Sequence, residues 1–171
     1  MYKHLLVLTG FPSSGKTSIS EKLENYFVCI STGLLREKIY PNKKPLEIKY
    51  PDDWEKIWDE VCLQRNEALY NDENVIIDSC AHTKYIREKF LFLPEDIENV
   101  RRKLIILNTD QEEIARREKT RDRNMEKVID AMMTDYQDPR EFEYGDVIIE
   151  EYQNNSFGDQ ENIVKKIIDD L

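Results

Sequence analysis

The residues with the most specific spacing form a loop near the N-terminus. Positions 10–17 read GFPSSGKT and match GxxxxGK[ST] without a gap, between an apolar run and a helical pattern. In such a loop, successive backbone N–H groups surround a phosphate, and the following helix directs its positive N-terminal end toward it. We expect Lys16 to contact the β- and γ-phosphates and Thr17 to ligate Mg²⁺. The predicted ATP-binding residues are Gly10, Ser13, Ser14, Gly15, Lys16, Thr17 and Ser18.

An acidic residue closes the third apolar run of the chain, Val75-Ile76-Ile77-Asp78. In enzymes with such a phosphate-binding loop (P-loop), an aspartate at this kind of strand end makes the second Mg²⁺ contact. An aspartate at a strand end also stabilises turns, and that alternative needs no metal. If the strands that end at Thr9 and Asp78 are neighbours, Asp78 falls beside Thr17. We therefore predict that Asp78 is catalytic and that Thr17 and Asp78 together hold the metal.

Basic side chains are concentrated after the fourth apolar run. The cluster contains Arg116, Arg117, Lys119, Arg121 and Arg123. Phosphoryl transfer places charge on the γ-phosphoryl oxygens, and cationic side chains that close over them stabilise it. Arg117 also follows Glu113 by four residues, a spacing that is typical of an ion pair on an exposed helix. We predict a lid over residues 110–136, with Lys16, Asp78, Arg117, Arg121 and Arg123 as the catalytic set.

The segment after the second apolar run is expected to face the phosphate acceptor, because substrates of open α/β sheets lie at the carboxyl ends of the strands. Arg36 lies there, and a planar guanidinium holds two oxygens of a phosphate. Arg87 occupies a similar place after the third run. We predict that both bind the acceptor, against the alternative of helix-surface arginines. His82 also follows the third run, where it would border the same site.

Composition and charge restrict the partners. The chain has 171 residues, of which 40% are hydrophobic, and this favours a single domain over residues 1–171. Its net charge of -10 repels nucleic acid and anionic membranes, so any polyanion must meet a local basic patch. Cys29, Cys62 and Cys80 form no CxxC pair, and no apolar run approaches the roughly 18 residues of a membrane span. We expect a cytoplasmic protein with no membrane partner.

Short apolar runs alternate with helical stretches, which predicts alternating strands and helices. The expected strands are Lys3–Thr9, Tyr26–Ser31, Asn74–Asp78, Lys103–Leu107 and Asp146–Ile149. Runs such as VIID and KLIIL suit parallel strands that are covered on both faces, so we expect an α/β sandwich. The expected helices are Ser18–Glu24, Asp52–Asn71, much of 110–136 and Gln160–Asp170. Trp54 and Trp58 fall on the apolar stripe of the longest helix and are predicted to be core residues rather than base-stacking ones.

The order GFPSSGKTS, then VIID, then an arginine-rich stretch resembles the small P-loop kinases. The chain is most similar to the polynucleotide-kinase-like group, which includes 5′-hydroxyl polynucleotide kinases and seryl-tRNA kinases, from Leu5 to about Ile149. The resemblance implies the three-layer P-loop NTPase fold, with a five-stranded parallel sheet, adjacent motif strands and an arginine-bearing helical lid. It also implies ATP as donor, Mg²⁺ as cofactor and a nucleotide or nucleic-acid end as acceptor.

One position departs from the pattern of that group. Members that phosphorylate hydroxyls carry an aspartate as general base three residues before the arginine that Arg36 matches, and this chain has Gly33 there. Residues 31–37, STGLLRE, also resemble the acceptor-binding segment of adenylate kinases. An acceptor phosphate is already a nucleophile and needs no base. For a hydroxyl acceptor, Asp78 and Glu37 are the nearest substitute carboxylates.

Several functions stay open at this point. The first is an ATP-dependent kinase that acts on a hydroxyl of a nucleotide or a nucleic-acid end. The second is a nucleoside monophosphate kinase, which the missing base and the acidic charge favour. A kinase for a small-metabolite or antibiotic hydroxyl and a P-loop switch without an acceptor are the others. The choice between ATP and GTP, the acceptor, the oligomeric state and the identity of the catalytic lid arginine also stay open.

Overall fold

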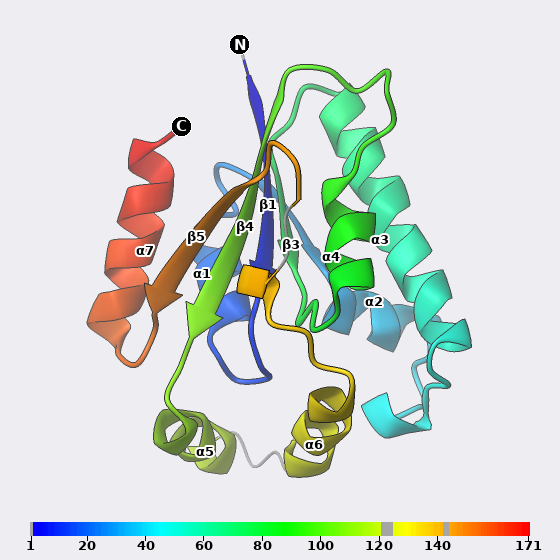
Figure 1. The fold of residues 1–171 in the computed structure, drawn as a ribbon, viewed down its shortest axis with the longest axis vertical. Helices are drawn as coiled ribbons and strands as arrows, with labels where there is room; N and C mark the ends of the chain where they lie inside the picture. The colour runs from blue at the N-terminus through cyan, green and yellow to red at the C-terminus, as the bar shows by residue number, and fades with distance from the viewer. Residues whose placement is uncertain (1, 121–124, 142–143) are drawn as a thin grey trace.

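A central sheet organises the chain, for which a computed structural model describes residues 2–120, 125–141 and 144–171. Its strands are β1 (Lys3–Thr9), β2 (Val28–Ser31), β3 (Val75–Asp78), β4 (Val100–Asn108) and β5 (Ile148–Gln153). They lie in the order β2-β3-β1-β4-β5, and every neighbouring pair is parallel (Figure 1). The five-stranded parallel sheet with adjacent motif strands is therefore confirmed.

Helices cover both faces of this sheet. They are α1 (Lys16–Lys22), α2 (Thr32–Ile39), α3 (Asp52–Tyr70), α4 (Lys84–Leu91), α5 (Gln111–Thr120), α6 (Glu126–Thr134) and α7 (Phe157–Asp169). Two short 3₁₀ turns span Pro45–Glu47 and Pro139–Glu141. Helices α1 and α7 pack on one face and α3 and α4 on the other, while α5 and α6 lie beyond the carboxyl ends of the strands (Figure 1). The result is a three-layer α/β sandwich.

The strand β1 is buried on both faces, which explains its unbroken apolar sequence. Leu5 and Val7 belong to the hydrophobic cluster under α3 and α4, whereas Leu6 and Leu8 belong to the cluster under α1 and α7. All four side chains are at most 2% exposed. Successive side chains of a strand alternate between the two faces of the sheet, and in β1 both sets are apolar and buried. Polar groups that could bind a ligand therefore come from the loop at the carboxyl end of β1.

Several boundaries differ from the sequence-based expectation; for example, β2 begins at Val28 instead of Tyr26, and β4 begins at Val100 instead of Lys103. Strand β5 runs to Gln153 instead of ending at Ile149, because one face of this edge strand packs through Glu150 and Tyr152 rather than through aliphatic residues. Helix α7 begins at Phe157, where the Ser156 hydroxyl accepts a hydrogen bond from the Asp159 N–H and fixes the first turn. The expected helical stretch 110–136 contains two helices, α5 and α6.

The register of the strands brings the sequence motifs together. Asp78 pairs with Leu8 on one side and with Ser31 on the other, so the ends of β1, β2 and β3 lie level. The loops that follow these ends are the P-loop, the start of α2 and the segment before α4. In the part of the chain that the structure describes, no helix is long and apolar enough to cross a membrane.

Candidate active site

The P-loop connects β1 to α1 in a conformation that requires glycine at its last turn. Gly15 has φ +96° and directly precedes the first helical residue, Lys16. A Cβ atom at Gly15 would lie 2.3 Å from the Asn154 amide nitrogen, so even alanine would displace its neighbours. The Asn154 side-chain amide donates to the Ser14 carbonyl at 2.6 Å and is 0% exposed. The P-loop is thus covered by Asn154, a residue that directly follows β5.

Lys16 folds back over this loop. Its ammonium group donates to the carbonyl oxygens of Gly10 and Phe11, each at 2.9 Å, and to the Ser14 hydroxyl at 3.3 Å. The residue is 6% exposed. These bonds hold a buried cation at the centre of the loop, where phosphate oxygens of a bound nucleotide would replace them.

Thr17 and Asp78 meet as the adjacency of β1 and β3 predicts. The Thr17 hydroxyl donates to the Asp78 carboxylate at 2.6 Å, and the Ser31 hydroxyl donates to the same oxygen at 3.5 Å. Asp78 is 6% exposed, whereas Thr17 is exposed beside it. The described residues contain no cluster of three or more metal-ligating side chains. Two oxygen ligands that leave room for phosphates and water fit Mg²⁺, which keeps much of its hydration.

Arg117 is the predicted lid residue that the structure places on the P-loop. From α5, its guanidinium donates to the Ser13 carbonyl at 3.2 Å and to the Asn154 carbonyl at 2.7 Å. Its Nε donates to Glu113 at 2.7 Å, and the side chain is 11% exposed. Glu118, from the same helix, accepts a hydrogen bond from the Ser13 hydroxyl. Helix α5 is therefore tied to the loop through both a cation and a carboxylate.

The remaining arginines of the cluster divide into two groups. Arg116 also pairs with Glu113, but its side chain is 69% exposed and points away from the loop contacts that Arg117 makes. The two guanidinium groups beside Glu113 lower the pKa of its carboxyl to about 2, so the pair that positions Arg117 stays charged in any assay buffer. Arg121 and Arg123 lie outside the described residues.

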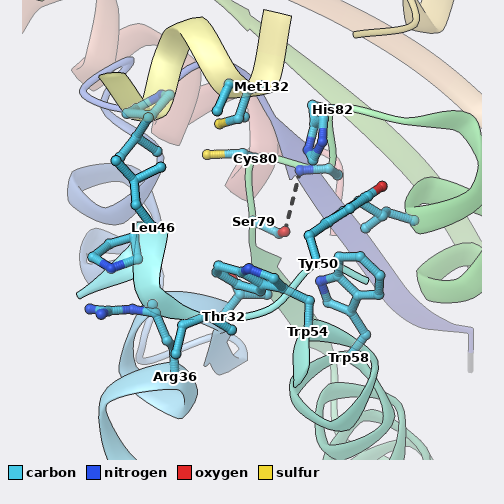
Figure 2. Close-up of a pocket in the computed structure, with 18 of the residues that line it drawn as sticks. Thr32, Arg36, Leu46, Tyr50, Trp54, Trp58, Ser79, Cys80, His82 and Met132 are labelled. Atoms are coloured by element: carbon cyan, nitrogen blue, oxygen red, sulfur yellow. Dashed lines mark hydrogen bonds between the residues drawn. The ribbon is translucent and has the colours of Figure 1, made fainter. Parts of the chain in front are cut away.

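A cavity of about 660 Å³ lies next to the P-loop. Its walls come from the start of α2, the 3₁₀ turn, the start of α3, the loop after β3 and one face of α6 (Figure 2). Helix α6 contributes Val128, Ala131 and Met132, and Met125 precedes its first turn, although no residue of this helix is buried. Its apolar face is thus turned to the cavity instead of to a core. A volume of this size suits a small molecule or a single nucleotide.

The two arginines predicted to bind the acceptor lie in different environments. Arg36 lines the cavity, and its guanidinium donates to the Lys43 carbonyl at 3.1 Å and to Glu37 at 2.6 Å. Arg87 is 0% exposed and donates to the Tyr144 hydroxyl at 2.6 Å and to the Ala81 carbonyl at 2.9 Å. The structure therefore brings Arg36 to the cavity, whereas Arg87 supports the loop behind its wall.

Aromatic residues form a wall of the cavity that the sequence reasoning did not find. Trp54 stacks on Trp58, with ring centroids 6.2 Å apart. The Tyr50 ring packs beside the rings of Trp58 and His82, with centroid distances of 6.0 Å and 6.2 Å. Trp58 is 3% exposed, so its prediction as a core residue is confirmed, while Trp54 is half-buried. Both nevertheless line the cavity. The sequence did contain a signal for this cavity wall: three aromatic residues lie in the segment from Tyr50 to Trp58, more than are required for the apolar stripe of one helix.

The cavity and the P-loop are joined at Cys80. The backbone carbonyl of Cys80 accepts from the Thr9 hydroxyl at 2.8 Å and from the Gly10 N–H at 3.4 Å, and the Gly10 carbonyl in turn accepts from the Lys16 ammonium at 2.9 Å. Cys80 also lines the cavity. Burial raises the pKa of the Cys80 thiol, so the thiol stays protonated beside the lysine. The lysine that would hold the donor phosphates therefore lies next to one end of the cavity.

Solved structures with the same architecture are numerous and distant in sequence. A sugar kinase from Janibacter sp. HTCC2649 matches with a TM-score of 0.70 and 13% identity, over 99% of this chain and 94% of that one. An APS kinase of Mycobacterium tuberculosis, in complex with AMPPNP and APS, matches with a TM-score of 0.68 and 13% identity, over 98% and 96%. A chain of the Pnkp1/Rnl/Hen1 RNA repair complex matches with a TM-score of 0.65 and 20% identity, over 84% and 47%.

These likenesses establish the P-loop kinase fold, including neighbours of the polynucleotide-kinase type, and the resemblance drawn from the motifs is confirmed. Among curated proteins, none matches the sequence. The family described as "AAA domain" matches residues 5–139, a span that holds the P-loop, Asp78, the aromatic wall and both helices beyond the sheet. The chain belongs to this family, within which its architecture is that of a small P-loop kinase.

Proposed function

We propose that this protein is an ATP-dependent phosphotransferase that moves the γ-phosphate to a hydroxyl of a nucleotide or of the terminal nucleotide of a nucleic acid. The observation that carries the proposal is the junction at Cys80, where the P-loop meets a cavity with an aromatic wall: Cys80 and Pro12 both line the cavity, and the Cys80 carbonyl accepts from the Gly10 N–H. A nucleotide-binding switch without an acceptor has no need of such a cavity. The proposal includes a single domain over residues 1–171, a lid over about 110–136 and a cytoplasmic location.

The donor side of the reaction rests on the P-loop. Lys16 is held at the centre of the loop, and Arg117 crosses it from α5, so two cations lie where charge develops on the transferred group. The APS kinase with the same fold was solved with AMPPNP, an ATP analogue, which supports ATP as the donor. Thr17 and Asp78 would hold Mg²⁺, which when bound neutralises charge on the β- and γ-phosphate oxygens.

The acceptor side rests on the cavity. Trp54, which stacks on the buried Trp58, and Tyr50 offer ring faces on which a nucleobase can stack, and base–aromatic stacking is worth about 1–3 kcal/mol per base. Arg36 and Lys49 line the same cavity, together with the carboxylates of Glu37 and Asp135. Planar apolar surface beside a guanidinium can recognise a base joined to a phosphate or sugar. Arg87 enters this proposal as a support for the loop that carries Cys80 and His82.

A nucleoside monophosphate kinase is the second candidate, and Gly33 is the observation that favours it. Gly33 lines the cavity without a side chain, three residues before Arg36. In that case the acceptor phosphate itself is the nucleophile, and Arg36 holds its oxygens bidentately. The two candidates use the same donor site and differ only in the reacting group that the cavity presents.

Transfer from γ-labelled ATP tests the proposal. The wild-type protein is incubated with Mg²⁺ and one of two acceptor pools, 5′-hydroxyl oligonucleotides and DNA or RNA nucleosides in the first, nucleoside monophosphates in the second. Label on the hydroxyl pool is the expected result. Conversion of the monophosphates to labelled nucleoside diphosphates, with no label on any hydroxyl, would replace the proposal by the second candidate. ATP binding without transfer to either pool would contradict both.

A further inference from the structure

The cavity contains a side chain that can replace the general base that Gly33 does not supply. We propose that His82 accepts the proton of the acceptor hydroxyl during phosphoryl transfer. This inference rests on the proposed function, because a hydroxyl acceptor needs a base and a phosphate acceptor does not. His82 lies in the loop after β3, lines the cavity and is half-buried.

The position of His82 relative to the donor site follows from its loop. Cys80, two residues earlier, accepts hydrogen bonds through its carbonyl oxygen from the Thr9 hydroxyl and the Gly10 N–H, and the Gly10 carbonyl in turn accepts from the Lys16 ammonium. In Figure 2, Cys80, His82 and Met132 occupy the upper part of the view, and Thr32, Arg36 and Trp54 the lower part. His82 therefore directly follows the segment that contacts the P-loop, and it lines the same cavity as Cys80 and Arg36, in which an acceptor would meet the γ-phosphate.

Other ionisable side chains in or beside the cavity fit this role less well. Glu37 is paired with Arg36 at 2.6 Å, and its side chain is 63% exposed. Asp78 bonds to Thr17, which commits it to the proposed metal. Asp135 is exposed after α6. A carboxylate in water is also a weak base at neutral pH, whereas an imidazole titrates near it.

The charged and ionisable groups around the His82 ring come from three parts of the chain. Burial lowers the pKa of His82 below its ordinary value, and the Arg87 guanidinium on α4 adds to this effect, whereas Asp135 after α6 opposes it. The ring of Tyr50, which precedes α3, lies beside the His82 ring, with the two ring centroids 6.2 Å apart. The ring is thus neutral at pH 7 and free to accept a proton, and the carboxylate of Asp135 faces the imidazolium that forms.

The step balances as follows. The acceptor oxygen forms a bond to the γ-phosphorus of ATP, and the bond from that phosphorus to the β,γ-bridging oxygen breaks. ADP leaves with the electron pair of that bond. The hydroxyl proton passes to the unprotonated ring nitrogen of His82, and the imidazolium then returns it to solvent. His82 ends unchanged, as a general base must.

The experiment compares His82→Gln with the wild type in transfer to the hydroxyl pool across pH 5–9. We expect kcat to fall about 100-fold or more in the variant, with KM for ATP unchanged. Wild-type kcat should decline on acidification, with its midpoint below 6.5, because protonated His82 cannot act as a base; this decline should be absent from the variant. His4→Gln is the matched control, since His4 lies at the start of β1, at the opposite end of the strand from the P-loop, and should keep the wild-type profile.

A second variant separates loss of the base from loss of the fold. A Cβ atom at Gly33 meets only the Ser31 hydroxyl, at 3.6 Å, so the cavity accepts a side chain there. We expect Gly33→Asp to restore transfer at least tenfold in the His82→Gln background, because it places a carboxylate three residues before Arg36, where the hydroxyl-phosphorylating kinases that this chain resembles carry their base. Wild-type activity that is unchanged in His82→Gln, at every pH, would overturn the role of His82 and leave the kinase proposal intact. Transfer by the wild type to neither pool would instead overturn the function on which it rests.

Discussion

The donor site and the acceptor cavity lie side by side but are built in different ways. The donor site is compact: Lys16 and Asp78 are each 6% exposed, Lys16 donates to two carbonyl oxygens of the loop, and Asp78 accepts from the Thr17 hydroxyl. The acceptor cavity is open, about 660 Å³ in volume, and one wall is a helix with no buried residue. Chemistry that every ATP-dependent kinase shares is therefore held rigidly, and the part that selects the acceptor is held by fewer contacts.

This contrast predicts that substitutions in the donor site abolish transfer to every acceptor. Lys16→Ala should lower kcat by several orders of magnitude, because it removes the cation that faces the transferred charge. Lys22→Ala is the control, since Lys22 lies in the last turn of the same helix and pairs with Glu161. Its rate and its melting temperature should stay near those of the wild type. Normal transfer by Lys16→Ala would remove the donor-site assignment.

The next effect concerns the helix that bridges the two regions. Arg117→Ala should reduce kcat by about 100- to 1,000-fold, because its guanidinium is the described lid cation that lies on the P-loop. Arg116→Ala removes the neighbouring guanidinium, which is 69% exposed, and should change kcat by no more than about twofold. Steady-state kinetics of the two variants measure the difference. Equal decreases in kcat for the two variants would mean that the positive charge of α5 matters but the position of each arginine does not.

The smallest effect is expected in the cavity, where it should depend on the acceptor. Trp54→Ala should raise KM for a base-containing acceptor roughly 10- to 100-fold, as expected for a lost stacking contact of 1–3 kcal/mol. KM for ATP should not change, because Trp54 touches the cavity and not the P-loop. Trp54→Phe keeps a ring and should recover most of the affinity. An acceptor KM that is insensitive to both substitutions would argue against a nucleobase on this wall.

Local signals account for what the sequence predicted well. Strand β1 matches its expected bounds, Lys3–Thr9, and α3 differs from its expected bounds by one residue. Both elements are specified by local sequence patterns, β1 by an apolar run and α3 by a long apolar stripe. The Thr17–Asp78 pair followed from the resemblance, which supplied the adjacency of two strands. Strand β5 extends further than expected, since at a sheet edge a strand needs only one apolar face.

The cavity could not be predicted, because its walls come from five separate segments. Helical periodicity shows that Trp54 and Trp58 point inward, and it says nothing about whether a neighbour or a cavity lies opposite. Arg87 illustrates the same limit. Its spacing after Asp78 suggests an acceptor ligand, yet its partner Tyr144 lies 57 residues away in sequence and holds it 0% exposed.

The contact between Asn154 and Ser14 has a consequence for how the protein is made. The two residues are 140 positions apart, and the Asn154 amide covers the Ser14 carbonyl of the P-loop. At about 5–20 residues per second, the ribosome needs roughly 7–28 s to reach the second residue after the first. A ligand stabilises only the folded state that binds it. Until Asn154 has been synthesised, the Ser14 carbonyl lacks this partner, so ATP can stabilise the complete P-loop of the folded protein only after residue 154 has emerged from the ribosome.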